Sequence, residues 1–129
     1  EIEQLATEAA APCKVHFVPH SGAWARGIHA TIHGRLAPGA ELAALKEALT
    51  GAYAGSPFVE LIDTPPRLKD VTGSNRARLA VAADAEAFVV MVVIDNLLKG
   101  AAGGALQWMN RLLSLPEDAG LRLPGAGWI

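Results

Sequence analysis

The run Phe88-Val-Val-Met-Val-Val-Ile94 leads straight into Asp95-Asn96-Leu97-Leu98-Lys99-Gly100, and this junction organises the rest of the chain. The apolar run predicts a strand, and the residues from about Leu98 to Leu115 predict a helix. Small side chains at the junction let a backbone or a flat ligand approach closely. An asparagine amide there can both donate and accept hydrogen bonds. The junction is therefore the strongest candidate for a functional site.

Segments on either side of the junction predict the other strands. Arg76–Ala83 is joined to the apolar run through Asp84-Ala85-Glu86, which predicts a β-hairpin. Gly27–Leu36 alternates apolar and polar side chains, as a half-buried strand does. Two shorter strands are predicted over Lys14–Pro19 and Phe58–Ile62.

Helices are predicted where apolar residues recur at helical spacing, over residues 1–11 and Glu41–Ala54. In the helix after the junction, the expected core stripe consists of Leu106, Met109, Leu112 and Leu113. Asp63–Asn75 is expected to form a long surface loop, and the tail to Ile129 should be irregular. Because regular βαβ alternation is absent, the pattern predicts an α+β fold with an antiparallel or mixed sheet and helices on one face.

Composition narrows the classes of protein that fit. A length of 129 residues with 51% hydrophobic content suits one folded domain. A net charge of −2 provides no basic field for nucleic acid or an anionic membrane, and the longest apolar run is far shorter than the roughly 20 residues of a membrane span. The single cysteine, Cys13, fits a reducing cytoplasm and is expected to pack as a small buried residue.

Several short phrases in this chain occur together, and in the same order, in a known enzyme family. Together with the junction, they resemble the C-terminal part of N-acetyl-gamma-glutamyl-phosphate reductase. The resemblance implies a glyceraldehyde-3-phosphate-dehydrogenase-like C-terminal fold, a homo-oligomer, and NADPH-dependent reduction of an acyl phosphate in arginine biosynthesis. The phrases are His16-Phe-Val-Pro-His20, Arg26-Gly-Ile28, Tyr53-Ala-Gly-Ser-Pro-Phe-Val59, Gly73-Ser-Asn75 and Leu115-Pro-Glu-Asp-Ala-Gly-Leu121.

The resemblance also implies how the chain is divided. Residues 1–97 would form a substrate and dimerisation domain, and residues 98–129 a helix and tail that pack on an NADP-binding domain. The chain begins at Glu1-Ile2 as if within a helix, which predicts a fragment of a longer protein. In the family, the cysteine nucleophile and the catalytic histidine lie upstream, so we expect this chain alone to be inactive.

Four residues are candidates for the site. Asn96 is the candidate for the nicotinamide cofactor, although Asp95 and Asn96 could instead cap the following helix. Arg26 and His20 are candidates for substrate binding. The guanidinium of Arg26 suits this role because it can bind a carboxylate or phosphate through two parallel hydrogen bonds. Glu1 corresponds in the resemblance to a glutamate that could orient the catalytic histidine.

Three further features allow two interpretations each. Lys99 could face a phosphate or simply solvent, and solvent is favoured. Gly73-Ser74-Asn75 could bind an anion or form only a turn. The pairs His16/His20 and His29/His33 have a spacing that suits metal binding on a helix, but on strands the two members lie roughly 13 Å apart. We therefore expect no metal site, and His29 and His33 should simply face solvent.

Other functions remain open at this point. The nearest alternative is the lysine-pathway reductase of a carrier-linked aminoadipyl phosphate, because the two families share nearly all these phrases. Aspartate-semialdehyde dehydrogenase shares only the Asp-Asn-Leu element well. The chain could also be a non-catalytic dimerisation module, or a metal-binding protein that metal analysis would reveal.

Overall fold

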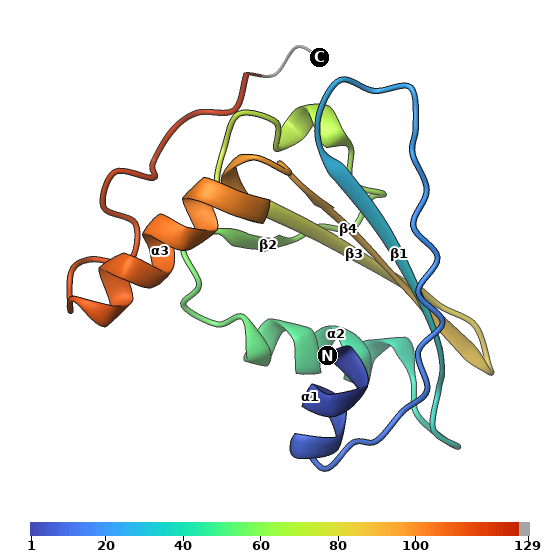
Figure 1. Cartoon of the computed structure of the whole chain (residues 1–129). Coiled ribbons are helices and arrows are strands. Elements are labelled where there is room, and N and C mark those ends of the chain that lie inside the picture. The colour runs from blue at the N-terminus through green and yellow to red at the C-terminus, as the bar shows by residue number, and fades with distance from the viewer. Residues whose placement is uncertain (127–129) are drawn as a thin grey trace.

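The computed structural model describes residues 1–126 and contains a four-stranded sheet with three α-helices (Figure 1). Two short helical turns complete the secondary structure, a 3-10 turn (η1) and a π-helical turn (η2). The predicted helices and strands occur, with one exception described below. Their bounds are α1 Ile2–Glu8, β1 Ile28–Arg35, α2 Leu42–Ala52, β2 Val59–Leu61, η1 Leu68–Asp70, β3 Ala77–Ala83, β4 Ala87–Ile94, η2 Leu98–Ala102 and α3 Gly103–Leu112.

The strands form one mixed sheet in the order β1-β4-β3-β2. The β3–β4 hairpin is antiparallel, as predicted, and β1 pairs antiparallel with the other edge of β4. β2 pairs parallel with β3, because the chain returns through the long segment between them. The sheet and helices confirm the predicted α+β class.

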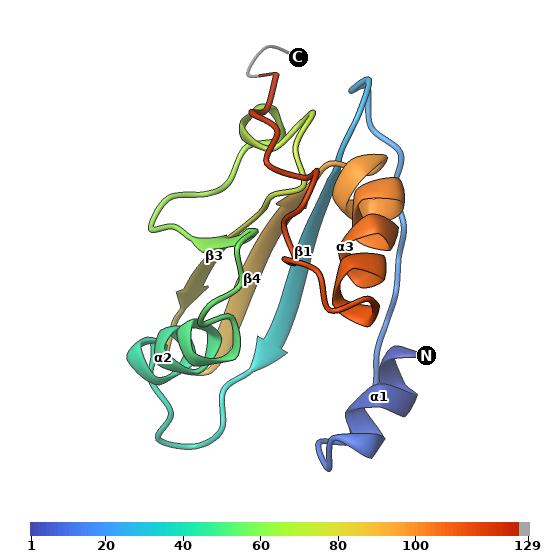
Figure 2. The same ribbon diagram turned by 90° about the vertical axis from the view of Figure 1, so that its left-hand side faces the viewer.

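One face of the sheet carries the apolar core. Ala77, Leu79 and Val90 are buried there, and Leu49 of α2 packs against them. Figures 1 and 2 show α2 and α3 on the same side of the sheet, which agrees with the expected placement of helices on one face. The helix α1 contributes no buried residue, and Figure 2 shows it standing apart from the sheet.

The predicted strand over Lys14–Pro19 is wrong. Residues 11–27 form no helix or strand, bend at residues 23, 25 and 26, and have side chains that are almost all exposed. An alternating segment becomes a strand only when another strand offers hydrogen bonds, and β1 pairs only with β4 among the described residues. Cys13 lies in this segment and is exposed, so its expected packing role is also wrong.

The expected core stripe of the last helix is also wrong. Of the expected residues, Leu106 is half-buried, whereas Met109, Leu112 and Leu113 are 46%, 80% and 62% exposed. The buried residues of α3 are instead Gly103 and Asn110, because polar side chains rather than leucines join this helix to its neighbours. The helix starts as the π-helical turn η2.

The segment Asp63–Asn75 is only partly a surface loop. Val71, Thr72, Ser74 and Asn75 are at most 2% exposed, because this stretch folds back over the end of β4.

The predicted half-burial of β1 is found only at Ala30 and Gly34, which are half-buried on the side of the sheet that faces the helices. In the described part of the tail, residues 113–126 form no helix or strand, as expected. The last three residues lie outside the described range.

Candidate functional site

Asp95 lies at the end of β4 and is the centre of the predicted junction. Its side chain is fully buried and accepts hydrogen bonds from the backbone N–H groups of Gly73, Leu97 and Leu98 at 2.7, 2.9 and 2.7 Å. Arg26 Nε lies 2.8 Å from Asp95 Oδ2, which completes the set of partners. One carboxylate therefore holds three segments together: the entry to β1, the turn before β3, and the start of η2.

This environment favours the ionised form of Asp95. Burial alone would raise its pKa, but the hydrogen bonds from Gly73, Leu98, Arg26 and Leu97 outweigh burial and lower the pKa below its ordinary value. A buried carboxylate persists when charge and donors compensate for its lost hydration. Asp95 is thus a permanent anion at neutral pH. The expected capping role is confirmed for Asp95, which accepts from the first N–H groups of the helical segment.

Asn96 does not cap the helix. Its Oδ1 accepts the backbone N–H of Gly27 at 2.7 Å, so the amide oxygen is bonded to the neighbouring segment and not to the helix. Gly27 has a φ of +109°, and a side chain there would meet Leu68 Cδ2 at 2.6 Å. The contact fixes the amide so that Nδ2 remains as its donor.

Arg26 lies with Asn96 at this junction, as predicted, but its charge is paired with Asp95. Its Nε and Nη2 both face the Asp95 carboxylate, at 2.8 Å and 3.1 Å. The side chain is 30% exposed, so part of the guanidinium still reaches the surface. Nη2 donates a hydrogen bond to Asp95 Oδ1, whereas Nε lies within ion-pair distance of Oδ2 without forming a hydrogen bond.

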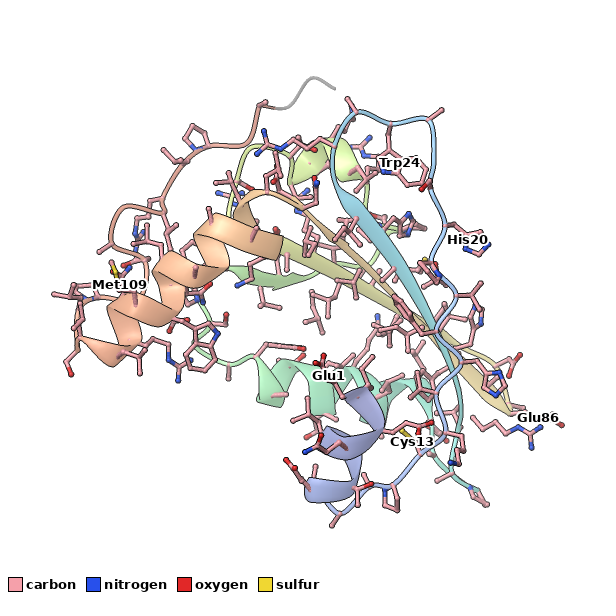
Figure 3. The ribbon with its side chains drawn as sticks, viewed as in Figure 1. Glu1, Cys13, His20, Trp24, Glu86 and Met109 are labelled. Carbon is pink, nitrogen blue, oxygen red and sulfur yellow. The ribbon has the colours of Figure 1, made fainter. Side chains whose placement is uncertain are left out.

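The structure does not bring His20 and Glu1 to the junction. His20 is exposed in the extended N-terminal segment, and its Nδ1 lies 3.1 Å from the carbonyl oxygen of Val18 (Figure 3). Glu1 precedes α1, is exposed and makes no capping hydrogen bond through its side chain. Among residues 1–126, no hydrogen bond links either residue to Asp95 or Asn96.

The segment Gly73-Ser74-Asn75 is more than a turn. Gly73 bonds to Asp95 as described, and Ser74 Oγ donates to the carbonyl of Val71 at 2.7 Å. Asn75 is 2% exposed, and its Nδ2 donates to Gln107 Oε1 on α3 at 3.0 Å. The segment therefore connects the Asp95 junction to the last helix.

Lys99 does not face solvent, so the favoured interpretation is wrong. Its Nζ lies 2.6 Å from Gln107 Oε1 and 5.6 Å from the centre of the Phe58 ring. Burial lowers the pKa of the Lys99 ammonium, and the negative charge of Glu117 partly opposes that effect. Gln107 in turn donates through Nε2 to Glu117, so its amide lies between the two charges. Gln107 and Glu117 were not predicted as site residues, because nothing in their spacing indicates that they share a contact.

A cavity of about 630 Å³ lies beside this network. Its floor is the helix-facing side of the sheet, formed by Val59, Leu79 and Val92, and its rim includes residues 52–56 after α2. Lys99 and Arg111 also line it. The volume is of the size that holds small organic molecules.

Two kinds of site have no support among the described residues. No group of three or more histidine, cysteine, aspartate or glutamate side chains in residues 1–126 could hold a metal ion. None of the helices described there is long and apolar enough to cross a membrane.

The fold and junction define a class, an α+β domain in which an inner strand of the sheet ends in a buried aspartate followed by a half-buried asparagine. The chain belongs to the family described as the semialdehyde dehydrogenase dimerisation domain, which matches residues 1–96. This agrees with the enzyme class that the quoted phrases indicated.

Individual relatives are similar over nearly the whole chain. N-acetyl-gamma-glutamyl-phosphate reductase from Acidithiobacillus ferrooxidans is 45% identical over 125 residues, which cover 94% of this chain and 36% of the relative. The reductase from Micrococcus luteus is 45% identical over 130 residues, covering 97% and 38%. That from Laribacter hongkongensis is 43% identical over 128 residues, covering 95% and 36%. The chain thus spans little more than a third of the length of these curated relatives.

Proposed function

We propose that this chain is the C-terminal part of a cytoplasmic reductase that uses NADPH to convert N-acetyl-gamma-glutamyl phosphate to the semialdehyde in arginine biosynthesis. The observation that carries the proposal is the 45% identity to reductases named for this substrate across 94% of the chain. That similarity extends through both the sheet and the Asp95 junction. The family match over residues 1–96 supports the dehydrogenase class independently.

In this proposal Asn96 contacts the cofactor. The chain fits such a role because Gly27 occupies the amide oxygen, which presents Nδ2 as a fixed donor. A nicotinamide carboxamide has an oxygen that can accept from it. The cofactor supplies the hydride when bound, whereas the backbone N–H of Gly27 holds the amide in place. The dinucleotide itself would be held by another part of the longer protein.

Substrate binding is proposed for Arg26 and His20. Asp95 holds Arg26 through Nε and Nη2, which leaves Nη1 for a substrate oxyanion. His20 is exposed and could take part only if its segment moves against the substrate. Glu1 is proposed to orient the catalytic histidine of the longer protein, and this chain alone is proposed to be inactive because it lacks the nucleophile.

The proposed division places residues 1–97 in a substrate and dimerisation domain and residues 98–129 against an NADP-binding domain. The exposed apolar side chains of α3 support the second assignment, because Leu112 and Leu113 are 80% and 62% exposed. Apolar side chains gathered on one helix favour contact with another protein surface.

We also propose that copies of the chain associate through β1. This strand lies at the edge of the sheet, and Ile28 and Ile32 are 46% and 51% exposed. An edge strand with unpaired backbone groups readily joins another chain. Sedimentation equilibrium of the purified chain tests this: a dimer that Ile32→Glu converts to a monomer supports it, and a monomeric parent chain contradicts it.

A chimera tests the proposed activity. The matching 125 residues of the Acidithiobacillus ferrooxidans reductase are replaced by this chain, and NADPH oxidation is followed with N-acetyl-gamma-glutamyl phosphate. We expect activity from the chimera, none from the chain alone, and a loss of at least tenfold in kcat/KM with Asn96→Ala. Lys14→Met, in the exposed N-terminal segment, is the control and should leave kcat/KM unchanged.

The same chimera separates the alternatives. Preference for a carrier-linked aminoadipyl phosphate would replace the proposed substrate with that of the lysine pathway. A folded, self-associating chimera without activity on either substrate would instead support a non-catalytic dimerisation module.

A further inference from the structure

The Asp95 carboxylate does not by itself fix the direction of the Arg26 side chain. Arg26 Nη2 donates to Asp95 Oδ1 at 3.1 Å, whereas Nε lies 2.8 Å from Oδ2 and forms no hydrogen bond. Strong geometric specificity between a guanidinium and a carboxylate requires two parallel hydrogen bonds, and here there is one. The orientation of Arg26 therefore depends on how the backbone that carries it is held.

Gly27, the next residue, is the point at which this backbone could move. It has no side chain, and its φ of +109° is one of many conformations open to a glycine. Two side chains hold it: its N–H donates to Asn96 Oδ1 at 2.7 Å, and its carbonyl oxygen accepts from Trp24 Nε1 at 3.2 Å. Arg26 lies inside the turn that the Trp24 bond closes, because that bond joins residues 24 and 27.

The indole ring of Trp24 is itself packed against the chain. A Cβ added at Gly22 would lie 1.7 Å from Trp24 Cζ3 and 2.1 Å from Cη2, so the ring lies directly on the Gly22 α-carbon. Any other residue at position 22 would displace the ring. Trp24 is 49% exposed on the loop that leads into β1 (Figure 3). Residues 22–27 thus form a closed turn, the Trp24 turn, with Arg26 inside it.

We propose that Trp24 is a positioning residue for substrate binding, because the Trp24 turn fixes the direction in which Arg26 presents its guanidinium. Trp24 acts through Gly27 and Arg26 and does not itself contact the substrate. Tryptophan suits this task, because its ring carries one N–H donor and also offers a large apolar surface for packing. The inference rests on the proposed role of Arg26 in binding a substrate oxyanion.

The chimera described above tests this role with Trp24→Phe, which keeps an aromatic ring and removes the N–H donor. Loss of one hydrogen bond should raise KM for N-acetyl-gamma-glutamyl phosphate about threefold to tenfold. We expect kcat to change by less than about twofold, because Arg26 would hold the substrate equally before and during the reaction. Phe17→Leu is the matched control, since Phe17 is an aromatic residue of the same segment and 77% exposed, and KM should stay at the parent value.

Two more variants separate positioning from direct contact with the substrate. Gly22→Ala displaces the ring without changing Trp24, so it should raise KM as Trp24→Phe does. In an Arg26→Ala chimera, Trp24→Phe should raise KM no further, because the residue that it positions is absent. A rise that persists without Arg26 would make Trp24 a direct substrate contact and would overturn the proposal. So would an active chimera in which neither Trp24→Phe nor Gly22→Ala changes KM.

Hydrogen exchange in the purified chain tests the Trp24 turn without using activity. The Gly27 amide proton should exchange at least about threefold faster in Trp24→Phe and Gly22→Ala than in the parent, because losing the turn loosens the bond to Asn96. Phe17→Leu should leave this rate unchanged. An inactive parent chimera would contradict the proposed function, and the Gly27 exchange rate would then decide the role of the turn by itself. Equal rates in all variants would overturn the inference whether or not the chimera is active.

Discussion

The Asp95 junction and the N-terminal segment up to residue 25 both carry phrases typical of the family, yet they differ sharply in structure. Asp95 is fully buried and receives three backbone N–H groups and a guanidinium. The N-terminal segment is exposed. Its hydrogen bond of longest sequence separation, 12 residues, runs from the Val15 N–H to Glu3 Oε1 at 2.8 Å. The difference shows that a short sequence motif has a fixed local structure only where its residues meet hydrogen-bond partners within the chain.

The largest effect should come from removing the centre of the junction. Asp95→Ala leaves three backbone N–H groups and the Arg26 charge without their buried acceptor, so we expect the free energy of unfolding to fall by about 3–5 kcal/mol. Urea unfolding measures this. Asp84→Ala is the control, because Asp84 also accepts two backbone N–H groups but lies exposed in the β3–β4 turn. Equal losses for the two variants would show that burial adds nothing at the junction.

A pair of glycine substitutions should change stability in opposite directions. A Cβ at Gly103 would lie 2.4 Å from Asn75 Oδ1 and 2.9 Å from the Leu98 carbonyl, whereas a Cβ at Gly51 in α2 would meet nothing within 4 Å. We expect Gly103→Ala to cost about 1–3 kcal/mol and Gly51→Ala to stabilise by about 0.5–1 kcal/mol. Thermal unfolding of both variants checks the signs. A neutral Gly103→Ala would mean that the contact between Asn75 and α3 is loose.

Acid should weaken the junction specifically. Burial raises the pKa of Asp95, but its hydrogen bonds lower that pKa by more. The pKa is therefore lower in the folded chain than in the unfolded chain. Its contribution is complete well above the unfolded value of about 3.9. It is lost as the pH falls from there through the folded pKa, because the unfolded chain then binds more protons. Unfolding free energies measured from pH 7 downward should show a flatter acid limb for Asp95→Asn than for the parent. Parallel curves would contradict this.

The smallest effect should come from the N-terminal segment. Glu3→Ala removes its hydrogen bond to Val15, but both partners are largely hydrated in any case. We expect the free energy of unfolding to change by no more than about 0.5 kcal/mol. Urea unfolding checks it, with Glu8→Ala on the same helix as a comparison. A loss above about 1 kcal/mol would show that this segment is held as firmly as the junction.

The sequence could predict those parts of the fold whose partners are close in the chain. The β3–β4 hairpin followed from two apolar runs joined by Asp84-Ala85-Glu86. Lys14–Pro19 alternates equally well, but alternation cannot say whether another strand lies alongside. For the same reason the exposure of Leu112 was unpredictable, since its apolar character does not reveal what α3 faces.

The candidate site shows the same limit more clearly. Composition and spacing placed polar residues at the junction, and the structure brings Arg26 and Asn96 together there. That Arg26 would be paired with Asp95 depends on a contact between residues 69 positions apart. The link from Asn75 through Gln107 to Lys99 likewise joins three separate segments. No local pattern encodes such meetings.

The long span of these bonds has a consequence for how the chain folds. Arg26 reaches Asp95, and Gly27 reaches Asn96, across 69 residues each, and Gly73 reaches Asp95 across 22 residues. Closing loops of that size lowers the entropy of the chain before the hydrogen bonds can compensate for that loss. The β3–β4 hairpin needs no such closure, so it is available early, while the junction assembles only after the β1 entry and the Gly73 turn have arrived. A molecule caught partway along this route would possess its β3–β4 hairpin and still lack an oriented Asn96.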